Sequence, residues 1–288
     1  MRKSPLNTTA LKGGLVTDEP DLASHLIAPG QPGFTDPRVA PPSRPGPRPL
    51  SPEEIAARRV GGVFCDWEIR AAIESGQIVV DPLDARRIQS SSVDVTLGHR
   101  FYATDDDEWG THRVINSFDP RTRDWYFGPV AARPHGEMLD VLHRSEPFVG
   151  VPLDALVLVL KPQQRVLAHT AEAIGIAWGG TSQMLAKSTT GRLGLAACLD
   201  AGWGDEGYVS PWTMELLNVN RRHALLLVVG MPIAQIVFYK MDRSEHPYTQ
   251  AGHYQAPGTA VPGRLTPWDP QLMLPRTLST DDLGKNDA

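Results

Sequence analysis

The sequence predicts a mainly β protein, and three observations lead to that class. Short runs of β-branched and apolar residues recur from Gln77 onward, and Gly, Pro, Asp or Asn separates each run from the next. One amphipathic stretch, from Asp66 to Ser75, comes before them and has the period of a helix. The chain has 288 residues, 41% of them hydrophobic, which is enough for a substantial core. This spacing indicates a mostly antiparallel barrel or sandwich with few helices.

The first 58 residues differ from the rest in composition. Eleven of the 26 prolines fall before residue 53, and the densest run is PPSRPGPRPLSP, from Pro41 to Pro52. No hydrophobic period survives among them, so we interpret 1–58 as a disordered arm. An arm that binds a partner or lies over a neighbouring subunit is the alternative. At its end, SPEEIAARR (51–59) has the pattern of a short capped helix leading into the domain.

The folded domain is predicted to span 59–275, and a polar tail follows at 276–288. After the helix at Asp66–Ser75, the expected strands are QIVV, SSVDVTL, ALVLVL, RVLAHTA, WTMELLNV, ALLLVV and IAQIVFYK. The stretch 104–146 carries the acidic run DDDE and several aromatic residues but no clear period. We expect an inserted loop or a hairpin excursion there.

Charge and cysteine content exclude several functional classes. The net charge of -5 argues against a general binder of DNA or RNA, which would need a basic face. Two cysteines, Cys65 and Cys198, provide neither a disulfide framework nor a Cys-rich zinc site. The sequence has no apolar run of about 18 residues and no apolar signal segment at its start. We therefore expect a cytoplasmic protein without a membrane anchor.

The segment from Lys187 to Asn218 points to a nucleotide site. Its first part offers cations and hydroxyls that could hold phosphates through charge-assisted hydrogen bonds, namely Lys187, Ser188, Thr189 and Arg192. Two carboxylates, Asp205 and Glu215, follow beyond a glycine-rich turn, where a sugar and a base could reach them. Solvated surface loops carry similar runs, and this alternative stays open on the pattern alone.

Glu215 lies inside WTMELLNV, an otherwise apolar predicted strand. An isolated carboxylate in such a strand would suffer a desolvation cost and a raised pKa unless it had a partner or a catalytic task. The alternative is a Glu on the solvent face of the strand, which the alternation of side chains allows.

A series of motifs, in order and at matching spacing, resembles the dCTP deaminase family, whose members are related to the trimeric dUTPases. The resemblance runs from Phe64 to Tyr248 through FCDWEIRAAIESGQIVVDP, QSSSVDVTLGHRF, LKPQQRVLAHTAE, AKSTTGRLGL, DAGWGDEGY, TMELLNVN, GMPIAQIVFYKM and EHPY. It implies the distorted jelly-roll, or β-clip barrel, of the dUTPase-like fold. One or two short helices are expected, the second as a turn at Ser188–Arg192.

The resemblance assigns Glu215 as the proton shuttle of a hydrolytic deamination. One carboxylate activates the water that attacks C4 of cytosine, protonates N3 and supplies a proton to the departing ammonia. Trimeric dUTPases generally have an apolar residue at this position, so Glu215 favours a deaminase. Zinc-dependent nucleobase deaminases carry H-x-E and P-C-x-x-C. Neither motif occurs in this sequence, and we expect no zinc.

The resemblance also implies the other site residues. Ser188 and Asp205 join Glu215 in the predicted catalytic set: Ser188 lies near the base and the attacking water, and Asp205 contacts the deoxyribose 3'-hydroxyl. Tyr208 stands near the sugar. A turn cap is the alternative for Asp205, and a core role is the alternative for Tyr208. The remaining nucleotide-binding residues are Lys187, Thr189, Arg192, Ala201, Trp203, Gln235, Tyr248 and His253.

The chain departs from the family pattern at two places. In the carboxyl-terminal segment, His253 stands where relatives have Lys and Pro257 where a Gln is expected, although Arg264 could substitute. In the turn before Asp205, three positions differ from the usual Thr, His and large aliphatic residue: Asp200, Cys198 and Gly204. The first change puts triphosphate affinity in question, and a monophosphate substrate is its alternative.

The predicted function is the deamination of dCTP to dUTP and ammonia. Alternatives are a dUTP diphosphatase or a bifunctional enzyme, because the AGW triplet (201–203) resembles the bifunctional members, and a nucleotide-binding relative that has lost turnover. The resemblance implies Mg²⁺ held through the substrate phosphates. It also implies a homotrimer whose subunits share each site. No nucleic-acid partner and no membrane partner are expected.

Overall fold

The computed structural model describes residues 62–104, 114–199, 201–255 and 268–282, all of which belong to one unit of the chain, Val60–Ala288. The Pro-rich arm and the capped helix expected at 51–59 lie outside the described residues. Two of the positions that depart from the family pattern, Asp200 and Pro257, also lie outside them, as does Arg264, the possible substitute.

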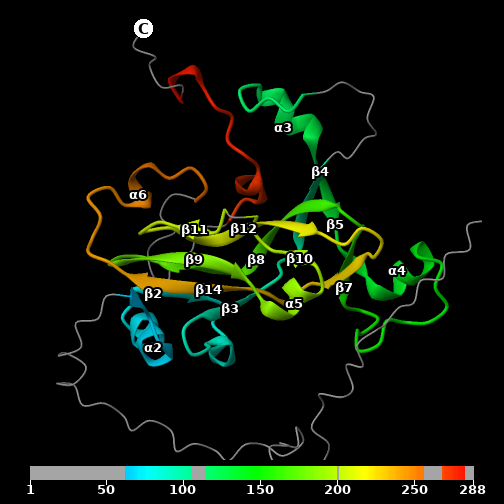
Figure 1. Ribbon diagram of the computed structural model, residues 1–288, viewed down its shortest axis with the longest axis horizontal. Coiled ribbons are helices and arrows are strands. Elements are labelled where there is room, and N and C mark those ends of the chain that lie inside the picture. The colour runs from blue at the N-terminus through cyan, green and yellow to red at the C-terminus, as the bar shows by residue number, and fades with distance from the viewer. Residues whose placement is uncertain (1–61, 105–113, 200, 256–267, 283–288) are drawn as a thin grey trace, which may run out of the picture. The chain divides into compact units, whose positions relative to one another are not determined.

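The described part is mainly β, as predicted, and all seven expected strands form (Figure 1). The strands are β1 (Gly62–Val63), β2 (Ile78–Asp81), β3 (Val93–Thr96), β4 (Arg100–Thr104), β5 (Phe127–Ala131), β6 (Arg133–Pro134), β7 (Leu156–Leu160), β8 (Arg165–Ile176), β9 (Gly180–Ala186), β10 (Leu195–Ala196), β11 (Trp203–Gly204), β12 (Val209–Asn218), β13 (Leu225–Val228) and β14 (Pro232–Lys240). The helices are α2 (Asp66–Glu74), α3 (Pro120–Tyr126), α4 (His135–Val141), α5 (Ser188–Arg192) and α6 (Tyr248–Ala251), with 3-10 turns at Ala85–Arg87, Pro270–Met273 and Thr280–Asp282. Every described helix is too short and too polar to span a bilayer.

The strands pair antiparallel in three sheets. The first runs β1-β14-β9-β11, with β3 also on β14, and the second runs β10-β12-β8-β4-β5, with β2 also on β8. The third is β13-β7-β6. Within the described residues no sheet closes on itself, so the architecture is a set of open sheets and not a closed barrel.

Alternating side chains of the first two sheets form the core. From β12, Trp212, Met214 and Leu216 are buried, and Ile236 and Phe238 of β14 are fully buried in the same cluster. Burying each such side chain contributes about 1.5–3 kcal/mol relative to leaving it exposed. The intervening residues of β12 therefore face away from the core, and Glu215 is one of them.

The predicted helix forms as α2, and its first turn is fixed by a capping box. The Glu68 carboxylate accepts the backbone N–H of Cys65 at 3.0 Å and also pairs with Lys240 at the end of β14. Ile69 and Ala72 form the buried face of α2. The expected helical turn at Ser188–Arg192 is present as α5.

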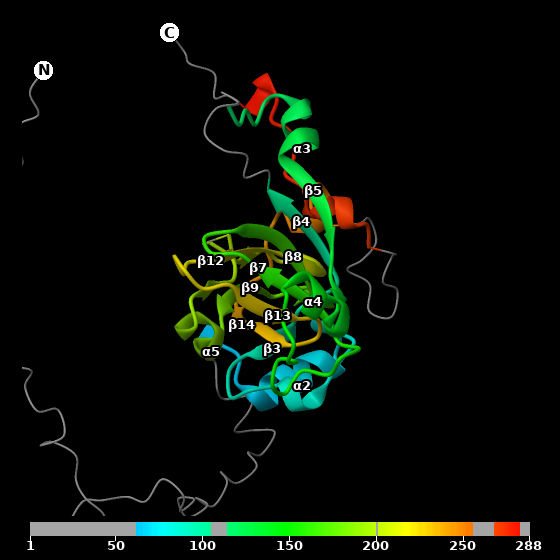
Figure 2. The ribbon, with the colours of Figure 1, turned by 90° about the vertical axis from the view of Figure 1, so that its right-hand side faces the viewer.

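The stretch 104–146 contains regular elements in its described part. β4 and β5 pair from Arg100↔Ala131 to Thr104↔Phe127, and α3 precedes β5. Figure 2 shows α3 beyond the end of this hairpin, beside the carboxyl-terminal segment, with the sheets between α3 and α2. One backbone hydrogen bond, from Leu278 N–H to the Ser117 carbonyl at 2.8 Å, joins that segment to the residues before α3.

Candidate active site

Glu215 lies on the face of β12 that points away from the core, but it does not face open solvent. It is half-buried and lines a cavity of about 470 Å³. Its Oε2 is shielded from solvent and has no hydrogen-bond partner among the described residues. Burial raises the pKa of Glu215 above its usual value, against lowering effects from its own backbone amide and from Arg165. A carboxylate with a raised pKa is a stronger base than an exposed one, which suits a group that takes up and returns a proton.

The cavity brings together about half of the predicted site. Besides Glu215, the predicted residues that line it are Ala201, Trp203, Asp205, Tyr208 and Tyr248. These residues come from the turn before β11, from β11 itself, from the turn before β12 and from the start of α6. The cavity is therefore lined by both carboxylates and aromatic rings.

The glycine-rich turn before Asp205 is held against β9. β11 pairs with β9 through Trp203↔Gln183 and Gly204↔Ser182. A Cβ on Gly204 would come within 2.4 Å of the Trp212 ring. The indole of Trp212 thus occupies space that a side chain at position 204 would enter.

Aromatic rings form a continuous wall of the cavity. Tyr208 packs edge-on against Trp212 at 5.2 Å and against Tyr248 at 5.1 Å between ring centroids. Burial raises the pKa of Tyr208, so its phenol stays neutral. Tyr208 therefore both packs and lines the cavity, and the two interpretations considered for it are compatible.

Asp205 is exposed and lines both this cavity and a second one of about 620 Å³. Its carbonyl accepts the N–H of Tyr208 at 3.0 Å, which closes the turn, while the described residues give its carboxylate no capping hydrogen bond. The second cavity shares Trp203 and Tyr248 with the first and includes His253. The carboxylate of Asp205 is thus available to a ligand.

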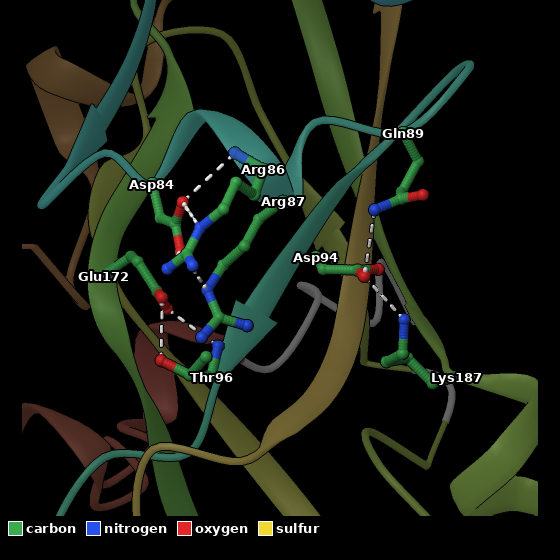
Figure 3. Close-up of polar contacts among 8 residues, drawn as sticks. All are labelled: Asp84, Arg86, Arg87, Gln89, Asp94, Thr96, Glu172 and Lys187. Carbon is green, nitrogen blue, oxygen red and sulfur yellow. Dashed lines mark hydrogen bonds and ion pairs between the residues drawn. The ribbon is translucent and has the colours of Figure 1, made fainter.

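The predicted cationic residues lie at α5 and directly before it, and Figure 3 shows one of them, Lys187, beside Asp94. Lys187 Nζ lies 2.7 Å from the Asp94 carboxylate, and Gln235 is the cross-strand partner of Asp94. Ser188 and Arg192 are exposed on α5. We name Lys187, Ser188, Arg192, Asp94 and Gln235 the Lys187 cluster. Neither it nor Thr189 lines either of the two cavities of a single chain.

Two residues of the site were not predicted. Asp94 has a buried Oδ1 without a hydrogen-bond partner among the described residues, and an Asp inside the apolar run SSVDVTL was a signal for it. Arg165 lines the cavity beside Glu215. The sequence contained no signal for its role, because Arg is a common first residue of a strand.

Comparison with known proteins places this architecture in a family. Residues 63–241 match the family model described as dCTP deaminase-like. The dUMP-forming dCTP deaminase of Methanospirillum hungatei is 33% identical over 187 residues, which cover 65% of this chain and 85% of that protein. The corresponding protein of Persephonella marina is 34% identical over 204 residues, 70% of this chain and 97% of that protein.

Among solved structures, the 2'-deoxycytidine 5'-triphosphate deaminase of Agrobacterium tumefaciens aligns with a TM-score of 0.44 and 19% identity, over 63% of this chain and 49% of that one. The family match covers β1 to β14 and therefore includes Glu215, Asp205 and the Lys187 cluster. The chain belongs to the dCTP deaminase-like family.

Proposed function

We propose that this protein deaminates dCTP by hydrolysis and that Glu215 is its proton shuttle. The observation that carries the proposal is the Glu215 carboxylate, half-buried in a cavity with one oxygen shielded and unpartnered. Family membership, and relatives named as dCTP deaminases, support the choice of a deoxycytidine nucleotide.

The reaction needs one base that becomes an acid. Ionised Glu215 takes a proton from water as the water oxygen bonds to C4 of cytosine, and N3 of the ring receives that proton. The tetrahedral intermediate then collapses: the C4–N4 bond breaks, the second proton of the water goes to the amine, and ammonia leaves with uracil as the product base. Asp205, which lines the same cavity, is the proposed ligand of the sugar hydroxyl.

The Lys187 cluster is the proposed site of the phosphates. Arg192 is exposed and makes no ion pair in the described part of the chain, so its guanidinium is available to a phosphate. Mg²⁺ carried by the substrate would neutralise phosphate charge there. Asp94 fits such a hard cation, because its buried Oδ1 lacks a partner and carboxylate oxygens suit Mg²⁺.

Two products were considered, and we propose dUMP over dUTP. The relatives from Methanospirillum hungatei, Methanosphaerula palustris and Persephonella marina, at 31–34% identity, are named as dUMP-forming. The AGW triplet had suggested the same bifunctional group. In such a reaction, water cleaves the bond between the α- and β-phosphates after deamination and releases pyrophosphate.

The test is incubation of the purified protein with dCTP, dCMP or dUTP in the presence of Mg²⁺, followed by separation of the products. We expect dCTP to give ammonia, dUMP and pyrophosphate in equal amounts. Accumulation of dUTP would support the deaminase without phosphate cleavage, and turnover of dCMP would support a monophosphate substrate. Binding of dCTP without any product would show that the chain has lost catalysis.

A further inference from the structure

The cavity around Glu215 contains a cation that the proposed mechanism does not use. Arg165 begins β8, where it pairs with Leu217 of β12, and Glu215 pairs with the next same-face residue of β8, Leu167. Arg165 and Glu215 are therefore diagonal neighbours on one face of the sheet, within reach of a long side chain. Both line the 470 Å³ cavity.

Arg165 is held from outside the β8–β12 ladder. Its Nη2 donates to the hydroxyl of Tyr126 at 2.6 Å, and its guanidinium lies 5.7 Å from the centroid of that ring. Tyr126 is the last residue of α3, and the next residue, Phe127, lines the cavity. The excursion between β4 and β5 thus reaches the site and fixes a charge there.

Arg165 is the one positively charged side chain among the described residues that line the Glu215 cavity. The other ionisable side chains lining the cavity are Asp205, Tyr208, Tyr248 and Tyr254, none of which carries a positive charge. No carboxylate forms an ion pair with Arg165 in the described part of one chain. No neighbouring carboxylate neutralises its charge by direct contact, so the positive charge stabilises negative charge anywhere in the cavity.

We propose that Arg165, anchored by Tyr126, is a positioning residue that keeps the Glu215 carboxylate ionised in a cavity whose burial favours the neutral acid. The inference rests on the proposed function only for the role of Glu215 in catalysis. A cation beside a carboxylate stabilises the charged form, so removing Arg165 raises the pKa of Glu215. The base would then be protonated over a wider range of pH.

The first test does not require activity. The carboxylate of Glu215 is titrated by ¹³C NMR in the full-length, ligand-free protein, with Glu215→Gln used to assign its signal. We expect Arg165→Met to move the midpoint upward by roughly 1 pH unit or more, the usual effect of an opposite charge nearby. Arg165→Lys should leave the midpoint close to the wild-type value because it keeps the charge. Tyr126→Phe should move the midpoint upward by less than Arg165→Met.

The second test uses the pH dependence of kcat/KM for dCTP. Its acidic limb should move upward with the titration midpoint in Arg165→Met, while KM above the limb stays near the wild-type value. The matched control is Arg123→Met, because Arg123 is on the same helix as Tyr126 but does not line the Glu215 cavity. This variant should move neither the titration midpoint of Glu215 nor the acidic limb.

Several results would overturn the proposal. A midpoint that stays fixed in Arg165→Met, whether or not the melting temperature falls, means that Arg165 has only a structural role. A raised KM with an unmoved limb makes it a substrate ligand instead. If Tyr126→Phe has the same midpoint as wild type, Tyr126 does not anchor Arg165. Wild-type protein that titrates as expected but releases no ammonia would refute the proposed function and leave this inference standing.

Discussion

Two glutamates on neighbouring strands, Glu172 and Glu215, have opposite surroundings in this protein. Glu172 on β8 accepts the backbone N–H and the hydroxyl of Thr96 at 2.8 and 2.7 Å (Figure 3), whereas Glu215 on β12 has a shielded oxygen without a partner. A satisfied carboxylate stabilises the fold, and an unsatisfied one in a cavity is typical of a reactive group. The strand pattern alone could not separate them, because each lies in an apolar strand and the partner of Glu172 is 76 residues away; only the motif resemblance singled out Glu215.

Replacing Glu215 with Gln should abolish ammonia release and leave nucleotide binding largely intact. The amide keeps the shape of the side chain but cannot shuttle protons. Rates of ammonia release and dissociation constants for dCTP measure the two effects. The matched control is Glu172→Gln, which should lower stability by about 1–3 kcal/mol through a mismatched hydrogen bond and still turn over below its melting temperature. Deamination by Glu215→Gln within about threefold of wild type would disprove the assignment.

Replacing Arg192 with Ala should raise the KM for dCTP more than tenfold. A hydrogen bond to a charged group contributes about 1.5–3 kcal/mol, and a tenfold change corresponds to about 1.4 kcal/mol. Arg222→Ala, an equally exposed change on the turn after β12, serves as the control. If wild-type protein bound deoxycytidine as tightly as dCTP, no phosphate site would exist for Arg192 to serve.

At the scale of elements, the predicted strands are those with strong local patterns, and the missed ones depend on neighbours. β9 (GTSQMLA) has few β-branched residues, yet it pairs with β14 over seven residues and with β11 on its other side. Tertiary pairing overrides its weak propensity. α3 was missed for a different reason. Its start signal, Asp119 as N-cap followed by Pro120, was present in the sequence within a stretch that had no clear period.

Glu206 connects the segment that carries Tyr248 to the sheets. The sequence analysis predicted a role for its neighbour Asp205 but none for Glu206. Its carboxylate accepts the N–H groups of Gly179 and Ser244 at 2.9 and 2.6 Å, and its carbonyl accepts that of Tyr248 at 2.8 Å. Burial raises the pKa of Glu206, but these hydrogen bonds and Arg243 lower it more, so the net pKa lies below its usual value.

This depressed pKa predicts a pH-dependent anchor. The stabilisation is fully present above the unfolded pKa of a Glu, about 4.3, and is lost as the pH falls through the lower folded value. Protection of the Ser244 and Tyr248 amides against hydrogen exchange, corrected for intrinsic rates, should therefore decrease when the pH is lowered below about 4. In Glu206→Gln protection should be low and independent of pH. The exposed neighbour provides the control: Glu245→Gln should behave as wild type, and a Glu206→Gln profile that still follows pH would contradict the anchor.

At the scale of the whole molecule, the position of the Lys187 cluster is the main consequence of the fold. The motif resemblance predicted both halves of the site, yet one chain places the cluster outside the cavity that contains Glu215. Sequence spacing could not show this, because it fixes the order of motifs and not the distance between them. The apolar run 224–239 is less informative than expected, since Ile233, Ile236 and Phe238 are fully buried within one chain.

We therefore expect a trimer with shared sites, and light scattering should give about three times the 31.5 kDa of one chain. Mixing subunits provides a sharper test. Glu215→Gln and Arg192→Ala subunits, each inactive or weak alone, should regain activity when co-assembled, because some sites then take both wild-type residues from different chains. Co-assembled pairs with no gain would place both residues in the same chain's site. A monomer that still deaminates would show that the sites are not shared. The 104–146 stretch would then be the alternative cover for the apolar run 224–239.

The contact between Gly204 and Trp212 also restricts how this turn can change during evolution. A side chain cannot be added at 204 while the indole occupies the space 2.4 Å from its Cβ position. A smaller residue at 212 would remove the ring atoms at the cost of a partly empty core, but the Ser182 hydroxyl would remain 2.6 Å from the same position. A side chain at 204 therefore requires changes on two strands, β12 and β9, and a single substitution at Gly204 meets both obstacles at once.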